Sequence, residues 1–148
     1  MFHINLDQTG KPYVLLVAEN HEILSFTESF EQKQSAWVNM LAQLKAFNDF
    51  NLFVQDNVAE DKVIVSFKNI DNREKISADG VSEIKPLIDI WLSDSKEPQP
   101  YVTVRGNNNE TLSTTELFSR KHAAWKNIEA QRTQLGGIMI PVQDNTGE

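Results

Sequence analysis

The sequence predicts an α+β fold in which a strand–strand–strand–helix unit occurs twice. The first observation is an internal repeat: residues 13–47 align without a gap to residues 101–135, with fifteen of the 35 aligned positions identical. Chance would give about two matches, so the repeat is a property of the architecture. The second observation is that apolar residues follow a strand-like pattern early in each copy and a helical period later.

The chain of 148 residues suits a single domain. We expect four parts, in the order first repeat, inserted segment, second repeat and tail, over residues 1–47, 48–86, 87–135 and 136–148.

A strand is expected to begin each unit. The stretch "FHINL" (residues 2–6) alternates apolar and polar residues, as a strand with one buried face does. "LIDIWL" (87–92) takes the same place before the second copy, and Pro12 and Pro100 follow at the same offset.

A hairpin is expected next in each copy, because two apolar runs flank a polar centre at residues 19–21 and 106–110. Asn and Gly in these centres tolerate the left-handed backbone of a tight turn.

The first helix is expected to bury one arc of side chains, namely Ala36, Trp37, Met40, Leu41, Leu44 and Phe47. Ser29 with Gln32 resembles a capping box, and Ser119 is expected to cap the second helix.

Three short patterns recur in both copies: Asn-x-x-x-Leu from Asn20 and Asn108, Thr-Glu-x-Phe from Thr27 and Thr115, and Lys-x-x-Ala from Lys33 and Lys121. With the ending "VQDNT", they resemble the YegP-like family of domains of unknown function. The resemblance implies tandem β-β-β-α repeats that form a single antiparallel sheet, with two helices packed on it and exchanged across it. It implies no catalytic residue. The chain departs from the family at Asn39 and Asn127, where glycine is usual.

Residues 48–86 have no counterpart in that pattern. "KVIVSFK" (62–68) reads as a strand that pairs with "LFV" (52–54), which predicts an inserted hairpin packed beside the sheet. A mobile loop is the alternative, because the segment is rich in acidic residues. In the tail, the apolar residues 138–142 are expected to dock, leaving the chain loose from Gln143 onward.

Composition excludes several classes of function. The net charge of −7 argues against a nucleic-acid binder, and no apolar stretch is long enough for a membrane span. The chain has no cysteine and no secretion signal, which favours the cytoplasm. His3, His21 and His122 have no ligand-spaced partners, so we expect no metal, and no motif indicates a cofactor.

Four repeat-related residues are candidates for a ligand site: Glu28 and Glu116 before the helices, and Lys33 and Lys121 five residues later. The glutamates would act as acid–base groups, or the lysines would hold an anion at the helix starts. Alternatively, each carboxylate complements a helix dipole and pairs weakly with its lysine on the surface.

A second candidate lies on the helix of the second copy, where Arg132 and Glu129 replace Leu44 and Leu41 of the first. Since burying an unpaired charge is costly, this edge is expected near water, with Trp125 only partly covered. Trp125, Glu129 and Arg132 would then form a binding patch. The alternative is that the inserted segment covers this edge.

The leading interpretation is a non-enzymatic protein-interaction module with an unidentified protein partner and no assigned catalytic residue. One rival is an enzyme or anion-binding protein that uses the Glu/Lys pairs, and another is a structural, self-assembling protein. A concave pocket with a buried Glu28 or Glu116 would favour the enzyme, whereas exposed carboxylates favour the module.

Overall fold

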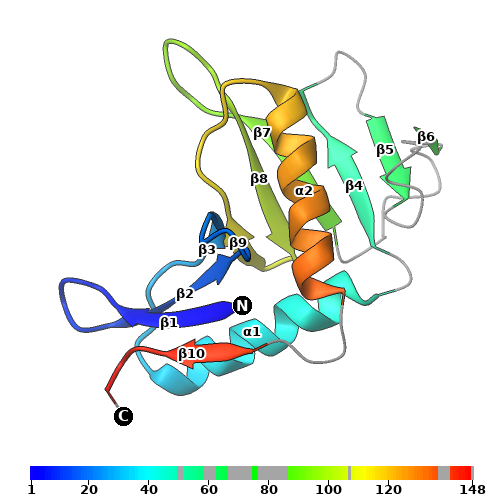
Figure 1. Ribbon diagram of the computed structural model, residues 1–148. Helices are drawn as coiled ribbons and strands as arrows, with labels where there is room; N and C mark the ends of the chain where they lie inside the picture. The colour runs from blue at the N-terminus through cyan, green and yellow to red at the C-terminus, as the bar shows by residue number, and fades with distance from the viewer. Residues whose placement is uncertain are drawn as a thin grey trace.

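The computed structural model describes residues 1–49, 52–58, 63–66, 75–76, 87–106, 108–136 and 141–147. Within them it forms one ten-stranded sheet and two helices (Figure 1). The strands are β1 (Phe2–Leu6), β2 (Pro12–Val17), β3 (Ile23–Phe26), β4 (Phe53–Asp56), β5 (Val63–Ser66), β6 (Lys75–Ile76), β7 (Leu87–Leu92), β8 (Pro100–Arg105), β9 (Thr111–Thr114) and β10 (Val142–Asp144). The helices are α1 (Lys33–Phe47) and α2 (Lys121–Leu135). The α+β class is confirmed.

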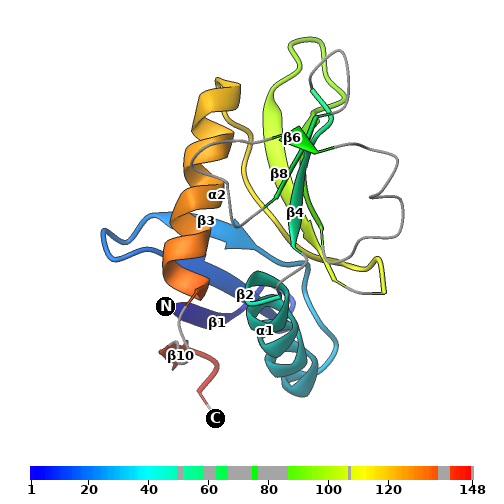
Figure 2. The same ribbon diagram turned by 90° about the vertical axis from the view of Figure 1, so that its right-hand side faces the viewer.

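The strand order divides the sheet into two half-sheets. The order is β10-β1-β2-β3-β9-β8-β7-β4-β5-β6, and the middle strands β3 and β9 pair only at Phe26 and Thr114. We call β10, β1, β2 and β3 the first half-sheet, and β9, β8, β7, β4, β5 and β6 the second. In Figure 2 the two half-sheets lie at opposite ends of the molecule, with β10 at one end and β6 at the other.

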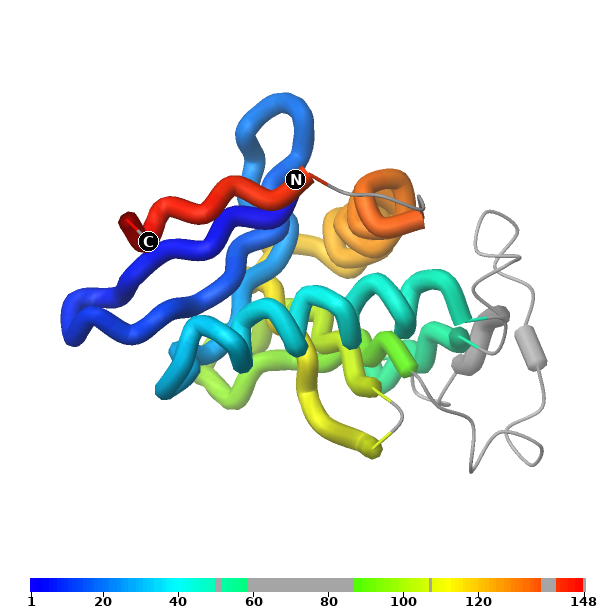
Figure 3. Tube along the Cα trace, turned by 90° about the horizontal axis from the view of Figure 1, so that it is seen from below, coloured from blue at the N-terminus to red at the C-terminus, as the bar shows by residue number. Residues whose placement is uncertain are grey.

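The expected antiparallel sheet is wrong at two places. β10 pairs parallel with β1, and β4 pairs parallel with β7, so the sheet is mixed. The reason is that the strand after each helix does not rejoin its own unit. β4 follows α1 but joins the second half-sheet, whereas β10 follows α2 and runs alongside β1 of the first (Figure 3).

The two units therefore exchange the strands β4 and β10. Each helix contacts the middle strand of its own unit and the inner strand of the other: α1 contacts β2 and β9, and α2 contacts β8 and β3.

The hairpin expected in the inserted segment is present in its backbone, with β4 antiparallel to β5. It does not pack beside the sheet but extends it, because β4 pairs with β7. The tail is also not loose from Gln143 onward, since Val142–Asp144 form β10.

The expected helix caps are wrong. α1 and α2 begin at Lys33 and Lys121, after Gln32 and Arg120, and neither N-cap side chain makes a capping bond. The preceding chain is held extended against the sheet. There, the Phe30 N–H donates to the Pro12 carbonyl at 2.7 Å, and the Phe118 N–H donates to the Pro100 carbonyl at 2.8 Å.

Buried polar side chains join each helix to the centre of the sheet. Asn39 Nδ2 donates to the Leu112 carbonyl at 2.9 Å, and Asn127 Nδ2 donates to the Leu24 carbonyl at 2.8 Å. These are the two positions at which the sequence departs from the YegP-like pattern, where glycine is usual. The strands β3 and β9 pair at a single position, so these carbonyls depend on the two amides for a hydrogen bond. The bonds fix each helix over the junction between the two half-sheets.

Candidate functional site: a groove on the open face of the first half-sheet

The structure separates the candidate lysines from the candidate glutamates. Lys33 Nζ lies 2.8 Å from Asp144 Oδ2, and Lys121 Nζ lies 3.0 Å from Asp56 Oδ2. Each ion pair joins the start of a helix to the end of the strand that crossed from the other unit. The lysines thus form ion pairs with the exchanged strands. An anion-binding role for them is not supported.

The sequence carries a signal for this arrangement outside the aligned ranges 13–47 and 101–135. The stretch "VQDN" occurs at residues 54–57 and again at 142–145, at the same separation of 88 residues as the rest of the repeat. Its bonds are duplicated too: the Asn57 N–H donates to the Ile90 carbonyl at 3.0 Å, and the Asn145 N–H donates to the Ile4 carbonyl at 2.8 Å.

The aspartate of the second VQDN stretch is strongly stabilised as a carboxylate. Hydrogen bonds from Lys33 Nζ and then from Thr146 lower the pKa of Asp144 to about 2. The ion pair with Lys33 therefore persists throughout the neutral and mildly acidic range.

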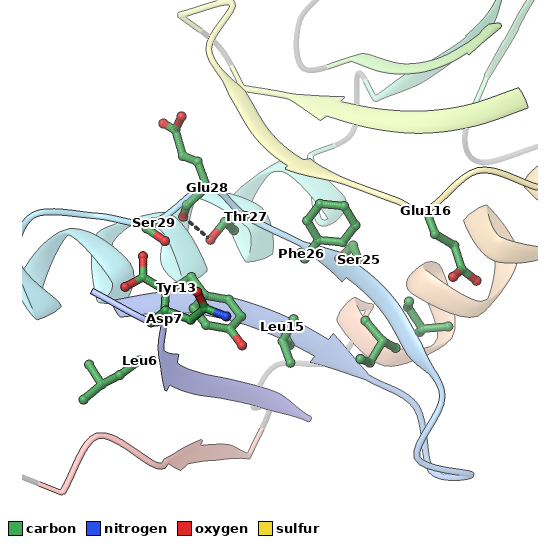
Figure 4. A pocket seen from close by; sticks show the side chains of 13 residues that line it. Leu6, Asp7, Tyr13, Leu15, Ser25, Phe26, Thr27, Glu28, Ser29 and Glu116 are labelled. Carbon is green, nitrogen blue, oxygen red and sulfur yellow. Dashed lines mark hydrogen bonds between the residues drawn. The ribbon is translucent and has the colours of Figure 1, made fainter. Parts of the chain in front are cut away.

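Glu28 and Glu116 line one groove of about 660 Å³ (Figure 4). Its floor belongs to β1, β2, β3 and their flanking residues, and the apolar lining consists of Leu6, Tyr13, Leu15, Ile23, Leu24 and Phe26. We call this the open-face groove. The volume is within the range typical of small-molecule pockets.

The groove exists because β2 and β3 of the first half-sheet carry apolar residues on both faces. Val14 and Leu16 point into the core and are buried, whereas Tyr13 and Leu15 alternate with them on the face away from the helices. Ile23 and Phe26 on β3 remain 49% and 39% exposed. Nothing in the described part of the chain covers these side chains fully.

The corresponding face of the second half-sheet is more polar, although Trp91 and Tyr101 also lie on it. Threonines stand 88 residues after Leu15, Ile23 and Phe26, at positions 103, 111 and 114. The same half-sheet carries a partly buried ion pair, in which Arg105 Nε donates to Asp89 Oδ2 at 2.7 Å. The two copies share their helix-facing core but differ on the open face, so the apolar groove is not required by the fold.

Carboxylates surround the groove. Glu28 and Glu116 are exposed, and Asp7 also lines it. Hydrogen bonds from the Ser29 hydroxyl and then from Thr9 hold the pKa of Asp7 well below its usual range. No lysine, arginine or histidine is among the described residues that line the groove.

The expected exposure of Trp125 is wrong. Trp125 is only 4% exposed and belongs to the core, and Glu129 and Arg132 beside it are half-buried. Trp37 of α1 is exposed instead, at 40%, with Val38 and Leu41 next to it, and Trp91 of β7 is 37% exposed. The premise of the binding patch at Trp125 is therefore not met.

The described residues contain no cluster of three His, Asp or Glu side chains that could hold a metal ion. Neither of the described helices has the length and apolar character that crossing a membrane requires.

The fold and the groove define a class: a small α+β protein with a mixed sheet in two halves, a helix on each half, and one apolar open face. No protein-family model matches the chain, and no curated protein matches its sequence. Its structure is similar to the solution NMR structure of yegP from E. coli, a protein of unknown function, with a TM-score of 0.60 and 14% identity over 99% of this chain and 93% of that one.

A second similar structure is that of a UPF0339 protein from Shewanella oneidensis, also determined in solution by NMR. Its TM-score is 0.55, with 11% identity over 97% of this chain and 88% of that one. The YegP-like fold expected from the sequence is thus confirmed as a fold. Neither similar structure supplies an activity.

Proposed function

We propose that the chain is a non-enzymatic interaction module that binds a protein partner through the open-face groove. The observation that carries the proposal is the contrast between the half-sheets. At three positions where the second presents threonines, the first presents Leu15, which is half-buried, and Ile23 and Phe26, which are exposed. Exposed apolar patches of this kind are typical of binding surfaces, and aromatic side chains such as Phe26 are frequent anchors.

The enzyme alternative has less support. Glu28 and Glu116 lie in a concave groove, but both are exposed, and their lysine counterparts are paired with aspartates elsewhere. Catalytic carboxylates usually depend on burial or a close charged partner. A cytoplasmic location is part of the proposal, since the sequence offers no cysteine for disulfides, and cell fractionation tests it.

The test is a comparison of two matched variants in affinity capture from native cells, followed by titration of each purified candidate partner. Ile23→Thr/Phe26→Thr gives the groove the residues that the second half-sheet has. Leu92→Thr is the control, because Leu92 is 48% exposed on β7, much as Ile23 is on β3, but lies outside the groove.

We expect a protein that binds the wild type and Leu92→Thr equally and binds the groove variant at least about tenfold more weakly. A second copy of this chain as the captured protein would favour the self-assembly rival instead. Equal binding of every captured protein to all three forms would contradict the proposal.

A further inference from the structure

We infer, on the basis of the proposed function, that the groove accepts an extended protein segment of basic–x–apolar–x–basic character. The apolar side chain would pack on Phe26, and the two basic side chains, four positions apart, would face Glu28 and Glu116. The apolar floor of the groove alone does not specify this chemistry of the partner.

The positions of the two glutamates follow from the strand pairing. Phe26 of β3 and Thr114 of β9 are direct antiparallel partners. Glu28 and Glu116 each follow two residues later, so they leave this pair in opposite directions. Side chains two residues apart on extended chain share a face, which agrees with both carboxylates lining the groove. Figure 4 shows Phe26 between them.

The spacing of the carboxylates sets the spacing of their partners. At roughly 3.3 Å per residue, two extended residues on each side of the Phe26–Thr114 pair separate the two Cα atoms by about 13 Å along the strands. An extended segment covers the same distance in four residues, and its residues i, i+2 and i+4 point to one face. One such segment therefore presents two basic side chains and a central apolar one together.

The charge around the groove selects the sign of the partner. Asp7 stays ionised, but its carboxylate already accepts hydrogen bonds from Thr9 and the Lys11 N–H. It therefore adds negative electrostatic potential to the groove and is less able to bind a partner directly. The nearby Lys11 Nζ is paired with Glu31 at 2.8 Å. With no cation among the described lining residues, the groove favours a cationic segment and disfavours an acidic one.

The test is selection of a displayed random heptapeptide library on the immobilised full chain. Binders are kept when they are lost with Ile23→Thr/Phe26→Thr and retained with Leu92→Thr. We expect Lys or Arg to be enriched at two positions four apart, with an apolar residue midway.

Synthetic copies of the selected peptides are then titrated against Glu28→Gln/Glu116→Gln. We expect affinity to fall about threefold to tenfold, and the dependence on salt to weaken. The matched control is Glu22→Gln/Glu110→Gln, which removes two repeat-related, exposed glutamates outside the groove and should leave the affinity unchanged.

The outcomes separate the inference from the function on which it rests. Groove-dependent peptides without a basic preference, or with equal affinity for the two glutamine variants, would overturn the inference and leave the binding module in place. Failure to recover any groove-dependent peptide would overturn the proposed function together with the inference.

Discussion

At the scale of the residue, the carboxylate of Asp144 joins the crossed strand β10 to the start of α1. Its pKa is lowered from an ordinary value of 3.8 to about 2, first by the bond from Lys33 and then by Thr146. A carboxyl whose pKa is depressed on folding stabilises the protein above its unfolded pKa. That stabilisation is lost as the pH falls through the folded value.

We therefore expect Asp144→Asn to lower the free energy of unfolding by a constant amount above about pH 5. The difference from the wild type should shrink between about pH 4 and pH 2. Urea unfolding across this range measures it, with Asp94→Asn as an exposed control. A difference that stays constant down to pH 2 would show that the Asp144 charge is not stabilising.

The buried amides allow a second prediction at this scale. Asn39 donates to the Leu112 carbonyl and also accepts from Gln43 Nε2 at 2.7 Å. Asn39→Ala leaves both groups without this partner in the core, so we expect a loss of about 1–3 kcal/mol in the free energy of unfolding. Asn127→Ala should behave alike, whereas Asn20→Ala in the exposed hairpin should cost less than about 0.5 kcal/mol. Losses below that value at both helix positions would refute the role of these amides.

At the scale of the element, α1 buries a face that is rotated from the one that apolar periodicity indicated, although Ala36, Met40 and Phe47 belong to both. Asn39 and Gln43 lie on the buried side of α1, while Trp37 and Leu41 face outward. The sequence pattern counted polar residues as exposed, and it contained no information about the strand carbonyls that these amides bind. It predicted the helices and their approximate ends well, but not their rotation.

Tryptophan fluorescence tests the rotation. In single-tryptophan variants, we expect acrylamide to quench Trp37 more strongly than Trp125, because the exposed fractions are 40% and 4%. Phenylalanine replaces the other tryptophans, and the variants are compared at equal folded fraction. Stronger quenching of Trp125 would restore the binding patch that the sequence suggested and contradict the packing of α2.

The exchanged strands, β4 and β10, were the part of the fold that was hardest to predict from the sequence. Their VQDN stretches are short, and one falls in the inserted segment while the other falls in the tail, so neither lay inside the aligned repeat. Parallel pairing across units also depends on contacts distant in the chain, such as β10 with β1. Local patterns predict strands but do not specify which partners they find.

At the scale of the whole molecule, each half-sheet is completed by a strand from the other unit. β4 pairs with β7, and β10 pairs with β1. We expect fragments 1–58 and 87–148 each to lack a cooperative thermal transition alone, because each has lost the strand that pairs with its first strand, β10 or β4, and the cross-unit bonds of its helix. An equimolar mixture should recover a transition. A cooperative melt from one monomeric fragment would contradict the interdependence of the halves.

The position of the open-face groove, the site of the proposed function, could be predicted only in part. Glu28 and Glu116 were singled out by the repeat, and both line the open-face groove. Lys33 and Lys121 instead pair with Asp144 and Asp56. The groove itself was not predicted, because which strand face lies opposite the helices depends on the packing of all the elements. A comparison of Leu15, Ile23 and Phe26 with the threonines of the second copy would have indicated it.

The most direct measurement of the central claim, that only the open face of the first half-sheet binds a partner, is site-specific photo-crosslinking in native cells. A photoreactive phenylalanine analogue replaces Leu15 in the groove or, as the matched control, Thr103 at the equivalent position of β8. We expect a discrete, saturable protein adduct from position 15, suppressed by excess wild-type chain, and no such adduct from position 103. Adducts of equal yield from both positions, or none from position 15, would contradict the claim.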